Sequence, residues 1–511
     1  MEYHINQERL TLGEAVLDES KEQPVDVDFS LPDYCPDIQR ILKCSVIPKI
    51  NSRNILADRL EIEGVATVSI LYMDASNNVV RSCEHSMPFS CSFNVSKEEP
   101  NSIVFTLAKI EYVNCRAVNS RRLDIHGAFS IHARVYSKKQ REVVGDIDGD
   151  SIQQKKITAK VSDISGTGFS QFLVEEVVEL GASYPLAKDI LRTDVIVMLS
   201  DYKVTPDKVI VNGDAVLRVL YVVDFDTGEL QNAEYTIPIS QVVDVVGATS
   251  ESVCDVKLDV LGFEVSDRND AAEGTILDVN LNLCATAIAY DDKEIDIISD
   301  AYSTSYELKP AYEQINFSKF HSKINENYSD KISIELKDKN VLKVLDMWNE
   351  MLVVKSQKEK DKILFVGKMN VCILAVDLEE NIFYTERIVD FEYEKNFNEN
   401  IENIFAEVEA KIISLAYRIV NENKIEVRFE IKFSAFVSEN KSYKNIVDIF
   451  IDEEKPKEKD SAALTIYYAD AGDSIWDIAC RHNTSIEDIK IQNDLQDDIL
   501  AVDTMLLIPI S

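Results

Sequence analysis

The chain of 511 residues is long enough for about three to four domains, and its 45% hydrophobic and 28% charged residues are typical of a folded globular protein. Its 90 acidic and 54 basic residues give a net charge of −36, which excludes nucleic acid as a main partner and disfavours an anionic membrane surface, because both need clustered cations. The N-terminal residues show no secretory signal, and no stretch approaches the roughly 18 apolar residues of a membrane span, so we expect no membrane insertion.

Nine cysteines are spread along the chain, and no two of them form a CxxC pair. Their odd number and wide spacing predict neither a disulfide framework nor a structural zinc site. We therefore expect small buried thiols in a reducing cytosol, with no metal and no cofactor.

Three segments share one pattern, in which an Ile-Leu or Val-Leu pair precedes a glycine inside a strand-like run. The separation of leucine and glycine is the same each time, from 42 to 64, from 191 to 213 and from 345 to 367. A period of about 150 residues is too long for a solenoid repeat and has the size of a whole domain. The sequence therefore predicts three tandem copies of one domain.

Apolar and polar residues alternate in these copies, as in 209–221 and 275–290. Alternation with many β-branched and aromatic residues is typical of half-buried antiparallel strands. We predict a mainly β fold, each copy being a sandwich or an open barrel, and leave the strand order open. The recurring glycine is expected at a bulge or at a close approach of two backbones.

The third copy is the most diverged. The first two carry a Tyr-Pro motif, with Pro36 and Pro185, ahead of the Ile-Leu pair, and the third has none. In addition, Ala375 of the third copy replaces Tyr72 and Tyr221 of the others.

Short helical turns are expected around 36–43 and 341–352. Residues 137–167 are polar and read as a linker, although KKITAKV within them suits a strand. Eight charges and a proline make 452–460 a solvated tether. The predicted units are β domains at 1–160, 161–310 and 311–451, a linker at 452–460 and a small C-terminal domain at 461–511.

The C-terminal segment predicts a strand, two helices and a strand. Residues 464–468 read as the first strand, Asp473 or Ser474 is expected to cap the first helix, and Ser485 with Asp488 begins the second. A unit of this size has a minimal core, so a central tryptophan is expected to fill it. The predicted core residues are Trp476, Ile478, Leu506 and Ile508.

This segment resembles a LysM domain, because the residues of the family pattern Y-x-V-x-x-G-D-T-L-W-x-I-A…N…L-x-I-P occur here in order from Tyr467 to Pro509. The resemblance implies a βααβ fold with a shallow groove for N-acetylglucosamine-containing glycans. Many carboxylates crowd the second loop, which favours a basic protein surface over a neutral sugar. The groove residues implied are Gly472, Asp473, Ser474, Ile475, Asn493, Asp494, Leu495, Asp497 and Asp498.

The repeats, with the segment SLPDYCPDI at 30–38, resemble the SPOCS domain of clostridial spore-coat proteins. SPOCS repeats combined with a LysM domain resemble coat morphogenetic proteins of the SipL type. The resemblance implies a location in the mother-cell cytoplasm, at the forespore surface and in the spore coat. The partners implied are the coat basement-layer morphogenetic ATPase (stage IV sporulation protein A), bound through the LysM region, and other coat proteins; we add self-association as an expectation.

No catalytic motif emerges, and we predict a non-enzymatic scaffold with no catalytic residue. His126 and His132 lie six apart but have no third ligand nearby, and Cys480 beside His482 lacks an orienting group. One alternative stays open, a cell-wall or cortex protein whose LysM domain binds peptidoglycan.

Overall fold

The computed structural model describes residues 3–95, 102–181, 184–268, 274–336, 339–359, 362–397, 403–457 and 464–509. The first domain is built from two three-stranded antiparallel sheets, β1-β6-β5 and β2-β3-β4, that enclose one apolar core. Its strands are β1 (His4–Ser30), β2 (Ile38–Leu56), β3 (Arg59–Asp74), β4 (Val80–Asn94), β5 (Ile103–Ala117) and β6 (Arg122–Asp148).

The second and third domains repeat this topology, with the sheets β11-β12-β7 and β10-β9-β8, then β13-β19-β18 and a sheet in which β14, β15 and β17 pair with β16. The predicted duplication and mainly β fold are confirmed. Of the two predicted architectures, each domain is a sandwich and not an open barrel. The strands are β7 (Ile152–Glu179), β8 (Asp189–Thr205), β9 (Lys208–Asp224), β10 (Glu229–Asp244), β11 (Val253–Arg268), β12 (Ile276–Ser303), β13 (Tyr306–Glu335), β14 (Val341–Trp348), β15 (Leu352–Glu359), β16 (Lys362–Asp377), β17 (Ile382–Asn396), β18 (Ile404–Asn421) and β19 (Lys424–Pro456).

The repeated glycine has the predicted role. A Cβ atom on Gly64, Gly213 or Gly367 would lie 2.2, 2.5 or 2.6 Å from the carbonyl oxygen of a residue on the neighbouring strand. In the first two domains the strand pairing also shifts beside this position, as expected of a bulge. Only glycine allows the two backbones to come so close.

Replacing Gly213 with alanine is therefore expected to lower the free energy of unfolding by about 1–3 kcal/mol, because the rigid carbonyl of Met198 must move. Urea denaturation followed by circular dichroism measures the loss. Gly181 is the matched control, since no atom of the described residues lies within 4 Å of the Cβ position there. Equal midpoints for both alanine variants would contradict the close approach.

The structure also explains why the first two domains carry the Tyr-Pro motif and the third does not. Tyr72 donates a hydrogen bond to the carbonyl of Pro36 (3.3 Å), and Tyr221 donates one to the carbonyl of Pro185 (3.1 Å). Both rings are fully buried. The third domain has Ala375 at this position, and it lacks both halves of the contact.

Both predictions of helical turns are wrong, because 36–43 leads into β2 and 341–352 forms β14 and the start of β15. Apolar residues lie on both faces of these strands. Ile38 packs in the core of the first domain, whereas Leu42 packs in a cluster shared by all three domains. Such two-sided burial produces a helix-like spacing within a strand.

The three domains close into a ring around this shared cluster. Ser82 of β4 donates a hydrogen bond to the carbonyl of Ile190 in β8 (3.0 Å), and Asn232 of β10 donates one to that of Leu345 in β14 (2.7 Å). Arg40 of β2 completes the cycle with the carbonyl of Ile382 in β17. Each domain therefore contacts the next through equivalent strands, and the third contacts the first.

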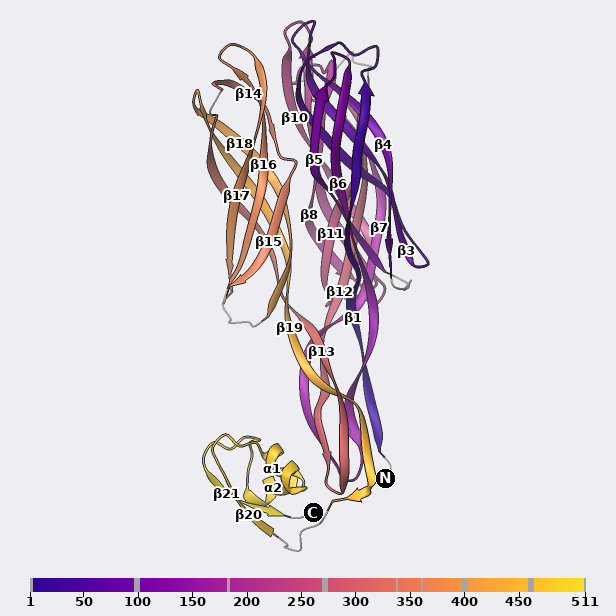
Figure 1. The fold of residues 1–511 in the computed structure, drawn as a ribbon, viewed down its shortest axis with the longest axis vertical. Coiled ribbons are helices and arrows are strands. Elements are labelled where there is room, and N and C mark those ends of the chain that lie inside the picture. Colours follow the sequence, from indigo (N-terminus) through magenta and orange to yellow (C-terminus); the bar gives the residue numbers. More distant parts are fainter. Residues whose placement is uncertain are drawn as a thin grey trace.

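The region 137–167 is not a linker, which corrects the prediction from its polarity. It completes β6 and forms the first half of β7, with a turn at 149–151. The long strands pair as ribbons, β1 with β6, β7 with β12 and β13 with β19, and these extend below the sandwiches as a narrow stalk (Figure 1). Only a thin inner side of each ribbon is apolar, so the stretch appears polar overall. The stalk is held by two clusters containing Leu10, Val143, Val161, Ile297 and Phe317, and Val144, Ile147, Ile298, Ile446 and Ile449.

The charged segment 452–460 is only partly a tether. Its first residues continue β19 to Pro456, pairing with Tyr306, and 458–460 lie outside the described residues. Lys455 forms ion pairs with Glu307 and Asp452, which explains how a charged segment stays in the strand.

Candidate functional site

The C-terminal module has the predicted βααβ order, with β20 (Leu464–Ala469), α1 (Ile475–His482), α2 (Ile486–Asn493) and β21 (Thr504–Pro509). Ser485 caps α2 by accepting a hydrogen bond from the backbone N–H of Asp488 (3.0 Å). The cap predicted for α1 is not formed. Ser474 makes no side-chain cap, and the Asp473 carboxylate accepts the N–H of Asp470 in the preceding turn.

The core of the module includes one residue from the stalk. Trp476 is 5% exposed, and its ring lies edge-on to Tyr302 of β12 at 5.0 Å between centroids. Its Nε1 donates to Asp300 (3.1 Å), and the Tyr302 hydroxyl donates to the carbonyl of Thr484 (2.6 Å). The module is thus docked beside the lower end of the stalk (Figure 1). Buried with Trp476 are Ile478, Leu506 and Ile508.

The two loops expected to form the LysM groove lie side by side. Backbone hydrogen bonds join Gly472 to Leu500, Ile475 to Asp498 and Leu500 to Asp473, at 2.7, 2.9 and 3.0 Å. The side chain of Ile475 points into the core. The two loops are therefore hydrogen-bonded to each other and form one continuous structure.

The remaining groove residues divide into structural and exposed ones. Asn493 accepts the N–H of Leu507 (2.7 Å) and donates to the carbonyls of Leu507 and Ile489 (2.8 Å each), so its polar atoms hold β21 against α2. Leu495 packs against the core. Of the predicted groove residues in the second loop, Asp494, Asp497 and Asp498 are exposed, and Asp498 pairs with Lys490.

The outer face of the two-stranded sheet is apolar and exposed. Ile466, Tyr468 and Met505 are 58%, 76% and 53% exposed, and Tyr468 lies opposite Met505 in the pairing. The exposed carboxylates of Asp470 and Asp503 border this face at one end. This face was not predicted, although residues 464–468 already alternate between its two sides in the sequence.

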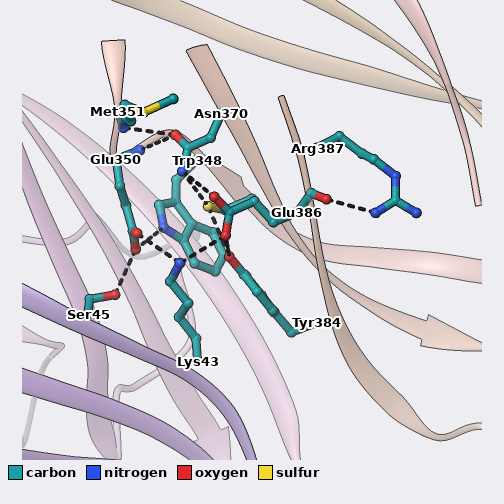
Figure 2. Close-up of polar contacts among 10 residues, drawn as sticks. Lys43, Ser45, Trp348, Glu350, Met351, Asn370, Tyr384, Glu386 and Arg387 are labelled. Atoms are coloured by element: carbon teal, nitrogen blue, oxygen red, sulfur yellow. Dashed lines mark hydrogen bonds and ion pairs between the residues drawn. The ribbon is translucent and has the colours of Figure 1, made fainter. Parts of the chain in front are cut away.

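Apart from the C-terminal module, a polar cluster lies where the first and third domains meet (Figure 2). The Nζ of Lys43 lies 2.9 Å from Oε2 of Glu350 and 3.1 Å from Oε2 of Glu386. Burial opposes the charge on Lys43, but the combined effect of Glu350, Cys372 and Glu386 outweighs burial, and the pKa of Lys43 is raised. Burial also opposes the charge on Glu386, yet hydrogen bonds from Asn370 and Tyr384 hold the pKa of Glu386 below its ordinary value.

Both carboxylates of this cluster accept hydrogen bonds in addition to pairing with Lys43. Ser45 and the indole of Trp348 donate to Oε1 of Glu350 at 2.7 and 3.0 Å. Asn370 and Tyr384 donate to Glu386 at 2.8 Å each. Each carboxylate thus accepts two hydrogen bonds and pairs with Lys43, an arrangement that suits a structural junction.

Both strand histidines that the sequence singled out are paired with carboxylates. His126 contacts Asp26 and Asp124, and His132 contacts Asp18. Burial raises the pKa of the Cys480 thiol, which disfavours the reactive thiolate. Over the described ranges no group of three His, Cys, Asp or Glu side chains is placed to hold a metal ion, and no helix is long and apolar enough to cross a membrane.

Comparison with known families agrees with this architecture. The family described as SipL, SPOCS domain, matches residues 37–118 and 187–266, which are corresponding parts of the first two domains, and the LysM domain family matches residues 469–509. The chain thus contains two segments that match the SPOCS domain and one that matches the LysM domain. This combination is that of the SipL type, which confirms the resemblance and associates the chain with sporulation and the spore coat. No curated protein and no solved structure matches the chain.

Proposed function

We propose that the chain is a non-enzymatic scaffold that links coat assembly to the forespore surface from the mother-cell side. It does so by binding the basement-layer ATPase, stage IV sporulation protein A, mainly through the LysM module. SPOCS and LysM are binding and scaffold families, which supports a scaffold rather than an enzyme. The observation that carries the proposal is the exposed apolar face of β20 and β21.

This face has the composition of a protein-binding surface. Tyr468 offers a large amphipathic ring beside Met505 and Ile466, and burying each such side chain contributes about 1.5–3 kcal/mol. The carboxylates of Asp470 and Asp503 at its border favour a partner with basic residues around an apolar centre. A neutral glycan uses neither the charge nor an open sheet face.

Replacing Tyr468 with lysine is expected to weaken binding of the full chain to the purified ATPase at least about tenfold, since one lost aromatic anchor costs roughly 2 kcal/mol. Titration by surface plasmon resonance measures the affinity. Ile491 is the matched control, because it is 72% exposed on α2, away from the sheet. If the lysine variants at 468 and 491 bind equally well, the sheet face is not the contact.

The LysM match also keeps peptidoglycan binding as a second candidate. Sedimentation of the full chain with purified cortex peptidoglycan tests it. Retention that is lost when Asp494, Asp497 and Asp498 are changed to lysine, together with no binding to the ATPase, would favour the glycan.

A further inference from the structure

The three domains share one topology, so corresponding positions can be compared. They differ at one sheet edge. β1, β7 and β13 are the corresponding edge strands. In every domain the pairing of the strand at the opposite edge shifts at the same place, after Ile110, Val260 or Ile412. This shared shift fixes which residues correspond. It places Leu173 of β7 at the position of Pro24 in β1 and Ser329 in β13.

Over this segment, exposed apolar residues line the outer side of the edge in the second domain alone. Phe169, Leu173 and Val177 follow one another at every fourth residue on β7 and are 58%, 58% and 44% exposed. The exposed residues at the same positions are Ser20, Pro24 and Asp28 in the first domain and Asn325, Ser329 and Ser333 in the third.

Polar residues and proline protect an edge strand against pairing with another chain. The first and third domains have this protection, and the second lacks it. Within the described residues, 169–179 of β7 pair only with β12. The other side of β7 therefore offers backbone N–H and C=O groups next to a row of apolar side chains, which is what an added strand needs.

Charge indicates which kind of strand could pair with this edge, a second copy of the chain or a strand of another protein. Glu175, Glu176 and Glu179 are exposed along it, and no cation pairs with them among the described residues. A second copy of the chain would bring the same carboxylates together, and like charges across paired strands are destabilising. A strand that alternates apolar residues with lysine or arginine matches both features.

We propose that the β7 edge of the second SPOCS domain is a docking site for an extended, basic strand of another protein. It is separate from the LysM face and does not depend on it. The LysM module and the β7 edge then give the scaffold two contacts of different chemistry, which suits a protein that joins two layers.

The test uses the full chain and a fluorescent synthetic peptide of alternating valine and lysine. Anisotropy should show saturable binding, and hydrogen exchange should slow at 169–179. Leu173→Lys should weaken binding at least tenfold, and Leu173→Ser severalfold. Ser329→Lys adds the same charge to the corresponding edge and should leave the affinity unchanged.

Three results would overturn the proposal. The first is equal peptide binding by the variants at 173 and 329. The second is a lack of the expected selectivity, seen either as exchange protection on β1 or β13 instead of β7 or as equal binding of a peptide with glutamate in place of lysine. The third is a dimer of the chain, seen by sedimentation and abolished by Leu173→Ser, which would make a second copy the occupant.

Discussion

Replacing Trp476 with alanine is expected to unfold the LysM module while the three β domains stay folded. The side chain is 5% exposed and fills the centre of a very small core. Its removal costs about 3–5 kcal/mol, which approaches the whole stability of a unit of this size. The change also removes the ring contact to Tyr302 and the hydrogen bond to Asp300, so the module loses its attachment to the stalk.

Hydrogen exchange with mass spectrometry separates the two consequences, because it reports on 464–509 and on the strands independently. The alanine variant should exchange rapidly over the module and normally over β3 and β9. Trp476→Phe retains a buried ring but loses the bond to Asp300, so the module should stay folded. Slow exchange of the module in the alanine variant would show that the tryptophan is a surface contact.

Much of the fold was predictable because its signals are local. Gly64, Gly213 and Gly367 recur at fixed positions since backbone contact admits no side chain there, and alternation revealed the strands. The stalk was not predictable. Its ribbons are paired over long sequence distances and bury only a thin side, so residues such as Val143 and Ile147 stand among charges and resemble a linker.

The candidate sites show the same division. The LysM core followed from the spacing around Trp476, but nothing in the sequence points to Tyr302 as part of that core, since it comes from a different domain. The β7 edge was likewise hidden. Phe169, Leu173 and Val177 become unusual only when the strand pairing reveals what the other two domains carry at the same positions.

Replacing Lys43 with methionine is expected to lower the free energy of unfolding by about 2–4 kcal/mol and to loosen the junction of the first and third domains. Methionine fills a similar volume but leaves two carboxylates facing each other without a cation. Glu350 is mostly buried, with 21% of its side chain exposed, whereas Glu386 is 37% exposed and partly screened by solvent. Urea denaturation gives the loss, and Lys139→Met is the control, because its pair with Glu14 is exposed and contributes under about 0.5 kcal/mol.

The pH dependence of stability tests the same cluster. The pKa of Lys43 is raised by folding, so its contribution is complete below the unfolded value near 10.4 and is lost as the pH rises through the folded value. The pKa of Glu386 is lowered, so its contribution is complete above about 4.3 and is lost as the pH falls through the folded value. The difference in stability between wild type and Lys43→Met should therefore stay constant from about pH 5.5 to 9 and shrink at both extremes. A difference that changes steadily across neutral pH would mean that other titrating groups hold the first and third domains together.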